Sequence, residues 1–128
     1  MKQTALEPTC PVGTAISALA GRWRSSIVCA LLDAHPQLIR YTDLQRRASA
    51  KAGAPLSRKT LSQELRAMMD QGLATRAEGE AVKPPLDVRY GLTEWGAALG
   101  PAADALAAWA LRAPGQAAAT RESISAIS

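Results

Sequence analysis

Apolar residues recur at helical spacing near the start of the chain. Three of them fall at i, i+4 and i+7 and predict a short amphipathic helix: Val12, Ile16 and Leu19. Pro11 suits the first position of that helix, with Cys10 as its N-cap and Gly21 at its end. A second helix is predicted over residues 22–32, with a stripe made of Trp23, Ile27 and Leu31. Pro36 stops it, because proline disfavours helical backbone at the preceding residue.

The middle of the chain carries two helix-start signals separated by a turn-rich segment. Thr42 and Gln45 fit the Ser/Thr-x-x-Glu/Gln capping box and predict a short third helix. Residues 49–56, SAKAGAPL, are small and turn-rich, so a loop is expected there. Ser57 then caps a fourth helix that closes at Gly72.

Two alternating segments follow the fourth helix and predict a β-hairpin. They cover residues 73–78 and 88–92, and the intervening GEAVKPPLD contains two prolines that stiffen a projecting tip. Residues 38–40 form a further short extended piece. Thr93 caps a long final helix that is predicted to reach Arg112.

This order of elements predicts a mainly α fold with a small β-hairpin wing. It is the layout of a winged helix-turn-helix, with helices added at both ends. One domain is expected over residues 10–112, which suits a chain of 128 residues. Residues 1–9 are predicted to be a flexible arm, and residues 113–128 a disordered tail with too little apolar bulk to pack.

Composition narrows the function classes. No apolar run approaches the ~18 residues of a membrane span, and the N-terminus lacks the apolar stretch of a signal peptide. We therefore expect a cytoplasmic protein with no membrane partner. The chain has one histidine, His35, and two cysteines, Cys10 and Cys29, without CxxC or HExxH spacing, so no metal site and no cofactor is predicted. These residues also offer too little for a catalytic constellation, so an enzyme is not expected.

The positive charge is concentrated in the middle of the chain. The net charge is +4. Residues 40–90 hold ten Lys/Arg against six Asp/Glu, whereas the remainder has five of each sign. A basic middle between neutral ends favours a polyanionic partner, although many solvated surfaces are mildly basic.

The fourth helix has two distinct faces. Its apolar stripe consists of Leu61, Leu65, Met68 and Met69. The opposite face presents Lys59, Gln63 and Arg66, flanked by Thr60 and Ser62. Arg and Lys suit guanine edges or phosphates, Gln suits adenine, and Ser and Thr suit either. The alternative is the solvated face of an ordinary amphipathic helix.

The position of this helix favours DNA binding. A capped helix and a turn precede it, as a recognition helix in the major groove requires, and a basic hairpin follows it. Double-stranded DNA is therefore the predicted partner. The candidate DNA-binding residues are Thr42, Ser57, Arg58, Lys59, Thr60, Ser62, Gln63, Arg66, Arg76, Lys83 and Arg89.

Between Cys10 and Trp109 the chain resembles the HxlR-type branch of winged helix regulators, which is related in fold to the MarR group. The matching pieces include Cys10-Pro11-Val12, Gly21-Arg22-Trp23, Leu44-Gln45-Arg46-Arg47, Leu56-Ser57-Arg58-Lys59-Thr60-Leu61, Gln71-Gly72-Leu73-Ala74-Thr75-Arg76, Pro84-Pro85 and Tyr90-Gly91-Leu92-Thr93-Glu94-Trp95-Gly96. The resemblance implies dimeric, cytoplasmic transcription regulators, some of which respond to oxidants or electrophiles through a cysteine. The chain departs from the pattern in two places, a longer loop at 49–56 and a polar Arg24-Ser25-Ser26 after the tryptophan.

The final helix carries an apolar a/d seam over two heptads. Its members are Trp95, Leu99, Ala102, Leu106 and Trp109. We expect a homodimer held by this helix and the first one, through Val12, Ile16, Trp95, Leu99, Leu106 and Trp109. The alternative is packing on its own domain. Pro101 removes one backbone hydrogen bond, so a kink is expected there.

Cys10 is the candidate redox or electrophile sensor. A helix N-terminus favours thiolate and so lowers the pKa of a cysteine, and the resemblance adds weight to this position. The alternative is an unreactive thiol. We expect Cys29 to be a small buried apolar residue and His35 to lie on the surface.

The sequence thus predicts a homodimeric regulator of transcription that binds a palindromic duplex sequence-specifically, with a small-molecule or oxidant effector as a further expectation. The competing interpretation is a winged-helix protein-interaction module that does not bind DNA. The polar, basic face of residues 57–66 argues against that, because protein-binding faces expose apolar anchors.

Overall fold

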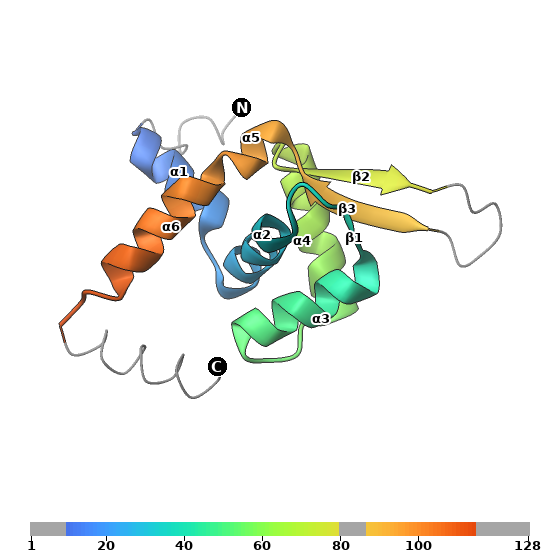
Figure 1. Ribbon diagram of the computed structural model, residues 1–128, viewed down its shortest axis with the longest axis horizontal. Helices are drawn as coiled ribbons and strands as arrows, with labels where there is room; N and C mark the ends of the chain where they lie inside the picture. The colour runs from blue at the N-terminus through green and yellow to red at the C-terminus, as the bar shows by residue number, and fades with distance from the viewer. Residues whose placement is uncertain (1–9, 80–86, 115–128) are drawn as a thin grey trace, which may run out of the picture.

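The computed structural model describes residues 10–79 and 87–114 (Figure 1). The predicted arm 1–9, the wing tip with Lys83, and residues 115–128 of the predicted tail lie outside this part of the chain. The described elements are α1 (Pro11–Leu19), α2 (Arg22–Ala34), β1 (Ile39–Arg40), α3 (Tyr41–Ala52), α4 (Arg58–Asp70), β2 (Ala74–Glu78), β3 (Val88–Leu92), α5 (Glu94–Ala97) and α6 (Leu99–Ala110). This is the predicted mainly α fold with a small wing.

A three-stranded antiparallel sheet in the order β1-β3-β2 forms the wing. Tyr90 at the centre of β3 lies opposite Ile39 on one side and Arg76 on the other. The predicted extended piece at residues 38–40 therefore pairs with the hairpin through β1. A strand of two residues is too short for the sequence to indicate this pairing. The hairpin extends to one side of the molecule, whereas α1 and α6 lie together on the opposite side (Figure 1).

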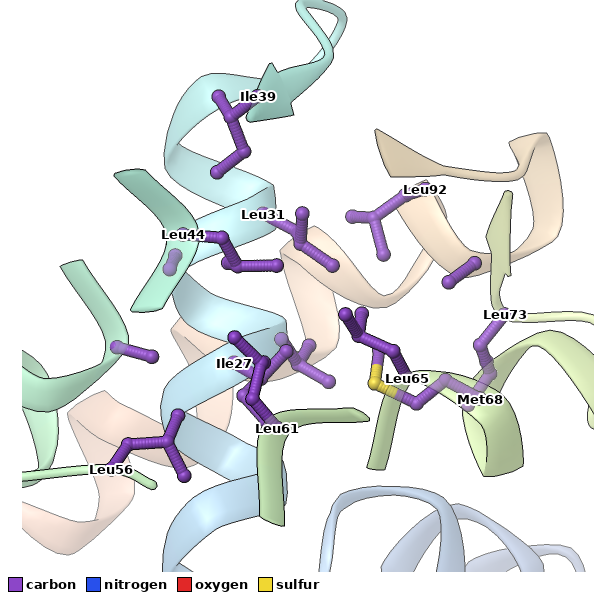
Figure 2. Packing of buried hydrophobic residues seen from close by; sticks show 14 residues of the cluster. Ile27, Leu31, Ile39, Leu44, Leu56, Leu61, Leu65, Met68, Leu73 and Leu92 are labelled. Atoms are coloured by element: carbon purple, nitrogen blue, oxygen red, sulfur yellow. The ribbon is translucent and has the colours of Figure 1, made fainter. Parts of the chain in front are cut away.

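One hydrophobic core joins α2, α3, α4 and the sheet (Figure 2). The stripe predicted for α4 is buried, except that Met69 is only partly covered. The fully buried large side chains come from four segments: Ile27, Val28, Leu31, Leu44, Leu61, Leu65, Met68 and Leu73. Burial of each large apolar side chain contributes roughly 1.5–3 kcal/mol, so this cluster fixes how α4 sits on the domain.

The predicted start and end of the third helix were wrong. The helix begins at Tyr41 with Arg40 as its N-cap, so Thr42 lies inside the first turn and does not cap it. It also continues to Ala52, where Gly53 adopts a left-handed conformation (φ 70°). Ala50, Lys51 and Ala52 favour helix, and the Gly53 amide closes the last turn by donating to the Ser49 carbonyl (3.0 Å). The Ser49 hydroxyl accepts from the Leu56 amide (3.0 Å) and so holds the following loop against the helix. Residues expected in a loop thereby complete the helix.

The final helix is interrupted close to Pro101, where a kink is predicted, although the a/d seam by itself indicates one continuous helix. It is divided at Ala98 into α5 and α6. Pro101 accounts for the break, because it lacks the N–H that would bond to the Ala97 carbonyl and its ring crowds that group. Gly96 in α5 lies so close to Leu73 that an added Cβ would overlap the Leu73 carbonyl oxygen.

Within the described ranges, no single helix is long and apolar enough to cross a membrane. Only α1 and α2 taken together reach that length and composition, and they meet at an 88° bend.

Candidate nucleic-acid interface

The start of α4 is fixed by a side-chain cap. The Ser57 hydroxyl accepts a hydrogen bond from the Thr60 amide (3.1 Å) and donates to the Thr60 hydroxyl (3.0 Å). Ser57 and Arg58 are exposed at this N-terminus, where unpaired backbone N–H groups and the helix dipole favour an anion. Thr60 is half-buried and its hydroxyl is already bonded, which leaves it less able to contact DNA than predicted.

The outer face of α4 is polar and exposed. Lys59, Gln63 and Arg66 are all exposed, on the side opposite the buried Leu61 and Leu65. No side chain in the described part of the chain pairs with any of these three. Their donors and acceptors are therefore available to a ligand.

Tyr41 holds the first turn of α4 in place, a role that the sequence did not indicate. Its hydroxyl donates to the Arg58 carbonyl (2.8 Å) and lies 2.7 Å from the Ser62 hydroxyl. The Arg58 guanidinium stacks on the Tyr41 ring, 4.7 Å from its centre. Ser62, a predicted DNA contact, thus has its hydroxyl hydrogen-bonded to a tyrosine of the preceding helix.

The wing connects to the same tyrosine. The rings of Tyr41 and Tyr90 meet edge to face with centroids 6.1 Å apart. Tyr90 lies opposite Arg76 in the sheet. A hydrogen bond to Glu78 and, to a smaller extent, one to Tyr90 raise the pKa of Arg76 above its usual range, so Arg76 stays charged.

The arginines of the wing have acidic partners, unlike those of α4. Arg76 pairs with Glu78 (2.6 Å), and Arg89 pairs with Asp87 (3.1 Å), which Arg40 also approaches (3.4 Å). A phosphate could replace these carboxylates, but the wing's net positive charge is smaller than its arginine count indicates. Thr42 is exposed in the first turn of α3.

Large apolar side chains are exposed on α1 and on the two helices that follow the wing, α5 and α6. Trp95 is 61%, Leu106 is 52% and Trp109 is 67% exposed, and Val12 and Ile16 of α1 are similarly open. A groove of about 520 Å³ between α1 and α6 is lined only by apolar residues, among them Val12, Ile16 and Leu106. Leu99 differs from the other predicted seam residues, because it is partly buried against its own core.

Cys10 lies exposed at the start of α1, beside that apolar face. Hydrogen bonding from the backbone N–H of Gly13 and, to a smaller extent, from that of Val12 lowers the pKa of the Cys10 thiol from its ordinary value. Cys29 is half-buried on α2 and lines a hollow of about 460 Å³ against α6. Within residues 10–79 and 87–114 no cluster of His, Cys, Asp or Glu is placed to hold a metal ion.

The arrangement of α3, turn, α4 and wing agrees with a comparison of the whole chain with protein families. The profile described as HxlR-like helix-turn-helix matches residues 18–117. The chain belongs to this family.

Individual relatives of this HxlR-like chain are described as regulators of transcription. An uncharacterized HTH-type transcriptional regulator of Methanothermobacter thermautotrophicus is 31% identical over 103 residues, which is 80% of this chain and 71% of the relative. Among solved structures, a MarR-family regulator from Porphyromonas gingivalis W83 is 29% identical (TM-score 0.64; 81% of this chain, 92% of that one). The reduced form of the regulator YodB from B. subtilis is 25% identical (TM-score 0.66; 85% and 98%).

The sequence patterns did not indicate the structural roles of two residues in this HxlR-like chain, Tyr41 and Arg24. Tyr41 contacts Arg58, Ser62 and Tyr90, which lie 17, 21 and 49 positions further along the chain. No local sequence pattern indicates such contacts. Arg24 was noticed only as part of a polar stretch, yet it is buried against α4. A charged residue within an otherwise apolar helix stripe was the available signal, because buried arginines need partners.

Proposed function

We propose that this protein binds duplex DNA as a homodimer and regulates transcription by placing α4 in the major groove. The observation that carries the proposal is the exposed outer face of α4, whose Lys59, Gln63 and Arg66 have no partner among the described side chains. The apolar stripe of the same helix is buried, so the helix cannot turn this polar face inward. A rigid helix with unsatisfied hydrogen-bonding groups suits recognition of base edges.

Other candidate residues have positioning roles in this proposal. Ser57, Arg58 and the N-terminal amides of α4 contact the phosphate backbone, and so does Thr42 in the first turn of α3. Thr60 and Ser62 act mainly within the protein, because their hydroxyls are already bonded. In the wing, Arg76, Arg89 and Lys83 approach the adjacent backbone or minor groove, and the first two exchange their carboxylate partners for phosphates.

The apolar face of α1 and α6 is the proposed dimer interface. Exposed Trp, Leu, Ile and Val side chains that flank a groove are uncommon on a monomer surface, and they mark association sites. A second copy presents the same face, as a two-fold interface requires. Two recognition helices would then meet successive major grooves ~34 Å apart and read a palindrome.

A selection from random duplexes tests the proposal. The full chain should enrich a palindromic sequence, and its affinity for random duplex should fall steeply with salt as counterions are released. A protein-interaction module would enrich no sequence and show no such salt dependence. That result would overturn the proposal.

Cys10 supports a further proposal, that an oxidant or electrophile controls DNA binding. Its exposed thiol, lowered pKa and place beside the proposed interface are the supporting observations. An adduct there, or a disulfide across the dimer, would change the spacing of the two α4 helices. DNA binding by the unchanged chain and Cys10→Ser, with and without diamide, tests this. Identical responses would make Cys10 structural.

A further inference from the structure

Arg24 is a charged residue in the interior of the domain. It lies on α2 and is only 8% exposed. Its neighbours on the same helix, Ser26, Ile27 and Val28, are also buried. Burial of an arginine costs several kcal/mol unless its N–H groups find acceptors, so its contacts show what it holds in place.

The guanidinium contacts two other helices at three points. Its Nε donates to Glu64 Oε1 (2.7 Å), and one terminal nitrogen donates to Gln71 Oε1 (2.8 Å) and to the Ala18 carbonyl (3.1 Å). Glu64 lies on α4, Gln71 is its C-cap, and Ala18 lies in the last turn of α1. One side chain of α2 thus joins the recognition helix to the first helix.

The two acceptors on α4 limit its rotation further, in addition to the buried apolar stripe. Glu64 and Gln71 are seven residues apart, which is about two helical turns and roughly 10 Å along the axis. They therefore share one face of α4, whereas Gln63 and Arg66 lie away from it. Anchors at two levels of one face resist both roll and tilt of the helix. Such a rotation would move the outward residues relative to base edges.

The contact with Ala18 ties α1 to this arrangement. No residue of α1 is buried, so few apolar contacts hold this helix on the domain. The Ala18 carbonyl is among the last four of α1, which have no partner within the helix. A cation at that end satisfies the carbonyl and complements the helix dipole. The Arg24 side chain thus stabilises the C-terminal end of α1 from α2.

We propose that Arg24 is a positioning residue for DNA recognition, which couples α1, at the proposed dimer interface, to the orientation of α4. This rests on the proposed function. Movement of α1, by dimer rearrangement or by modification near its start, would reach α4 through the guanidinium. Arg24 itself contacts no DNA.

The test separates positioning from stability. The first variant is Arg24→Lys, which keeps the charge but cannot bond three acceptors in a planar fork. The second is Arg24→Met with Glu64→Met, which removes both members of this partly buried ion pair so that neither charge is left without its partner. Lys51→Met is the control: it breaks another ion pair, with Asp33 (2.6 Å), but touches neither α1 nor α4. The positive charge that it removes should weaken binding to both duplexes alike and so leave their ratio unchanged.

Each protein is titrated with a duplex that the unchanged chain enriched and with a random duplex of equal length. Both Arg24 variants should lose about 2- to 30-fold affinity for the enriched duplex. Their affinity for random duplex should change much less, and Lys51→Met should keep the ratio. Retention of the ratio in either folded Arg24 variant overturns the proposal, because the fork would then be dispensable.

Hydrogen exchange gives a measurement without DNA. In the double variant the amides of α1 should exchange faster, while those of α3 keep their protection. Unchanged exchange in α1 would overturn the coupling between the helices. If the unchanged chain enriches no duplex, the proposed function is wrong independently of Arg24. Hydrogen exchange then still shows whether Arg24 holds α1 in place.

Discussion

The Arg58 guanidinium stacks on the ring of Tyr41, and the hydroxyl of the same tyrosine donates to the Arg58 backbone carbonyl. Both ends of Arg58 are therefore set by one residue of the preceding helix. A cation held flat on an aromatic ring is worth roughly 0.5–1 kcal/mol at an exposed site and loses less freedom when it meets a phosphate. The first turn of α4 is thus organised before any ligand arrives.

Tyr41→Phe should weaken DNA binding moderately. The ring still supports Arg58, but Arg58 and Ser62 both lose the hydroxyl that joins them to α3. Loss of these bonds should lower the free energy of unfolding by about 0.5–1.5 kcal/mol. Tyr41→Ala should weaken binding further, because the stacking is lost too. Equal affinities of the two variants would show that the ring contributes nothing.

Substitutions on the outer face of α4 should reduce specificity. Gln63→Ala or Arg66→Ala should cost about 1–3 kcal/mol on an enriched duplex, because each removes a candidate base contact. The cost on random duplex should be much smaller. Arg112→Ala is the matched control, since it removes an exposed arginine beyond the end of α6. Equal losses on both duplexes would reduce these residues to phosphate contacts.

The features of α4 were predictable because they are local. Its cap, its apolar stripe and its polar face depend on residues within a few turns of one another, and all three appear as the sequence indicated. The Thr93 cap was predictable for the same reason. A helix period and a capping hydroxyl need no knowledge of the rest of the chain.

The errors arose where distant or competing contacts decide the outcome. At the end of α3, the helix propensity of Ala50, Lys51 and Ala52 outweighs the competing turn signals until Gly53 ends the helix. The pairing of β1 with β3 and the contacts of Tyr41 and Arg24 join segments that only the folded chain brings together. Leu99 fits the a/d spacing but packs on its own core, which the spacing of apolar residues alone does not distinguish from a dimer seam.

Leu106→Asp should dissociate the proposed dimer. Leu106 is exposed beside the α1–α6 groove, and a carboxylate buried there against a second copy would lack a partner. Ala108→Asp is the control on another face of α6, because Ala108 is exposed and does not line the groove. Analytical ultracentrifugation at low micromolar concentration should show a monomer only for Leu106→Asp. A dimeric Leu106→Asp would place the interface elsewhere.

The thiol of Cys10 should react at lower pH in the folded protein than in the unfolded chain. The amides of Gly13 and Val12 lower its pKa, so the folded state holds more thiolate at neutral pH. The rate of alkylation by iodoacetamide, followed against pH in a Cys29→Ser background, should reach half its maximum at a lower pH without urea than with it.

The same shift fixes the direction of its effect on stability. Because the pKa of folded Cys10 lies below that of the unfolded chain, its contribution to stability is present above the unfolded pKa. That contribution is lost as the pH falls through the folded pKa. Cys10→Ser should therefore flatten the dependence of the unfolding midpoint on pH in this window, in the same Cys29→Ser background. Coincident alkylation profiles in the folded and unfolded states would mean that the start of α1 does not activate the thiol, and the proposed sensing by Cys10 would lose its chemical basis.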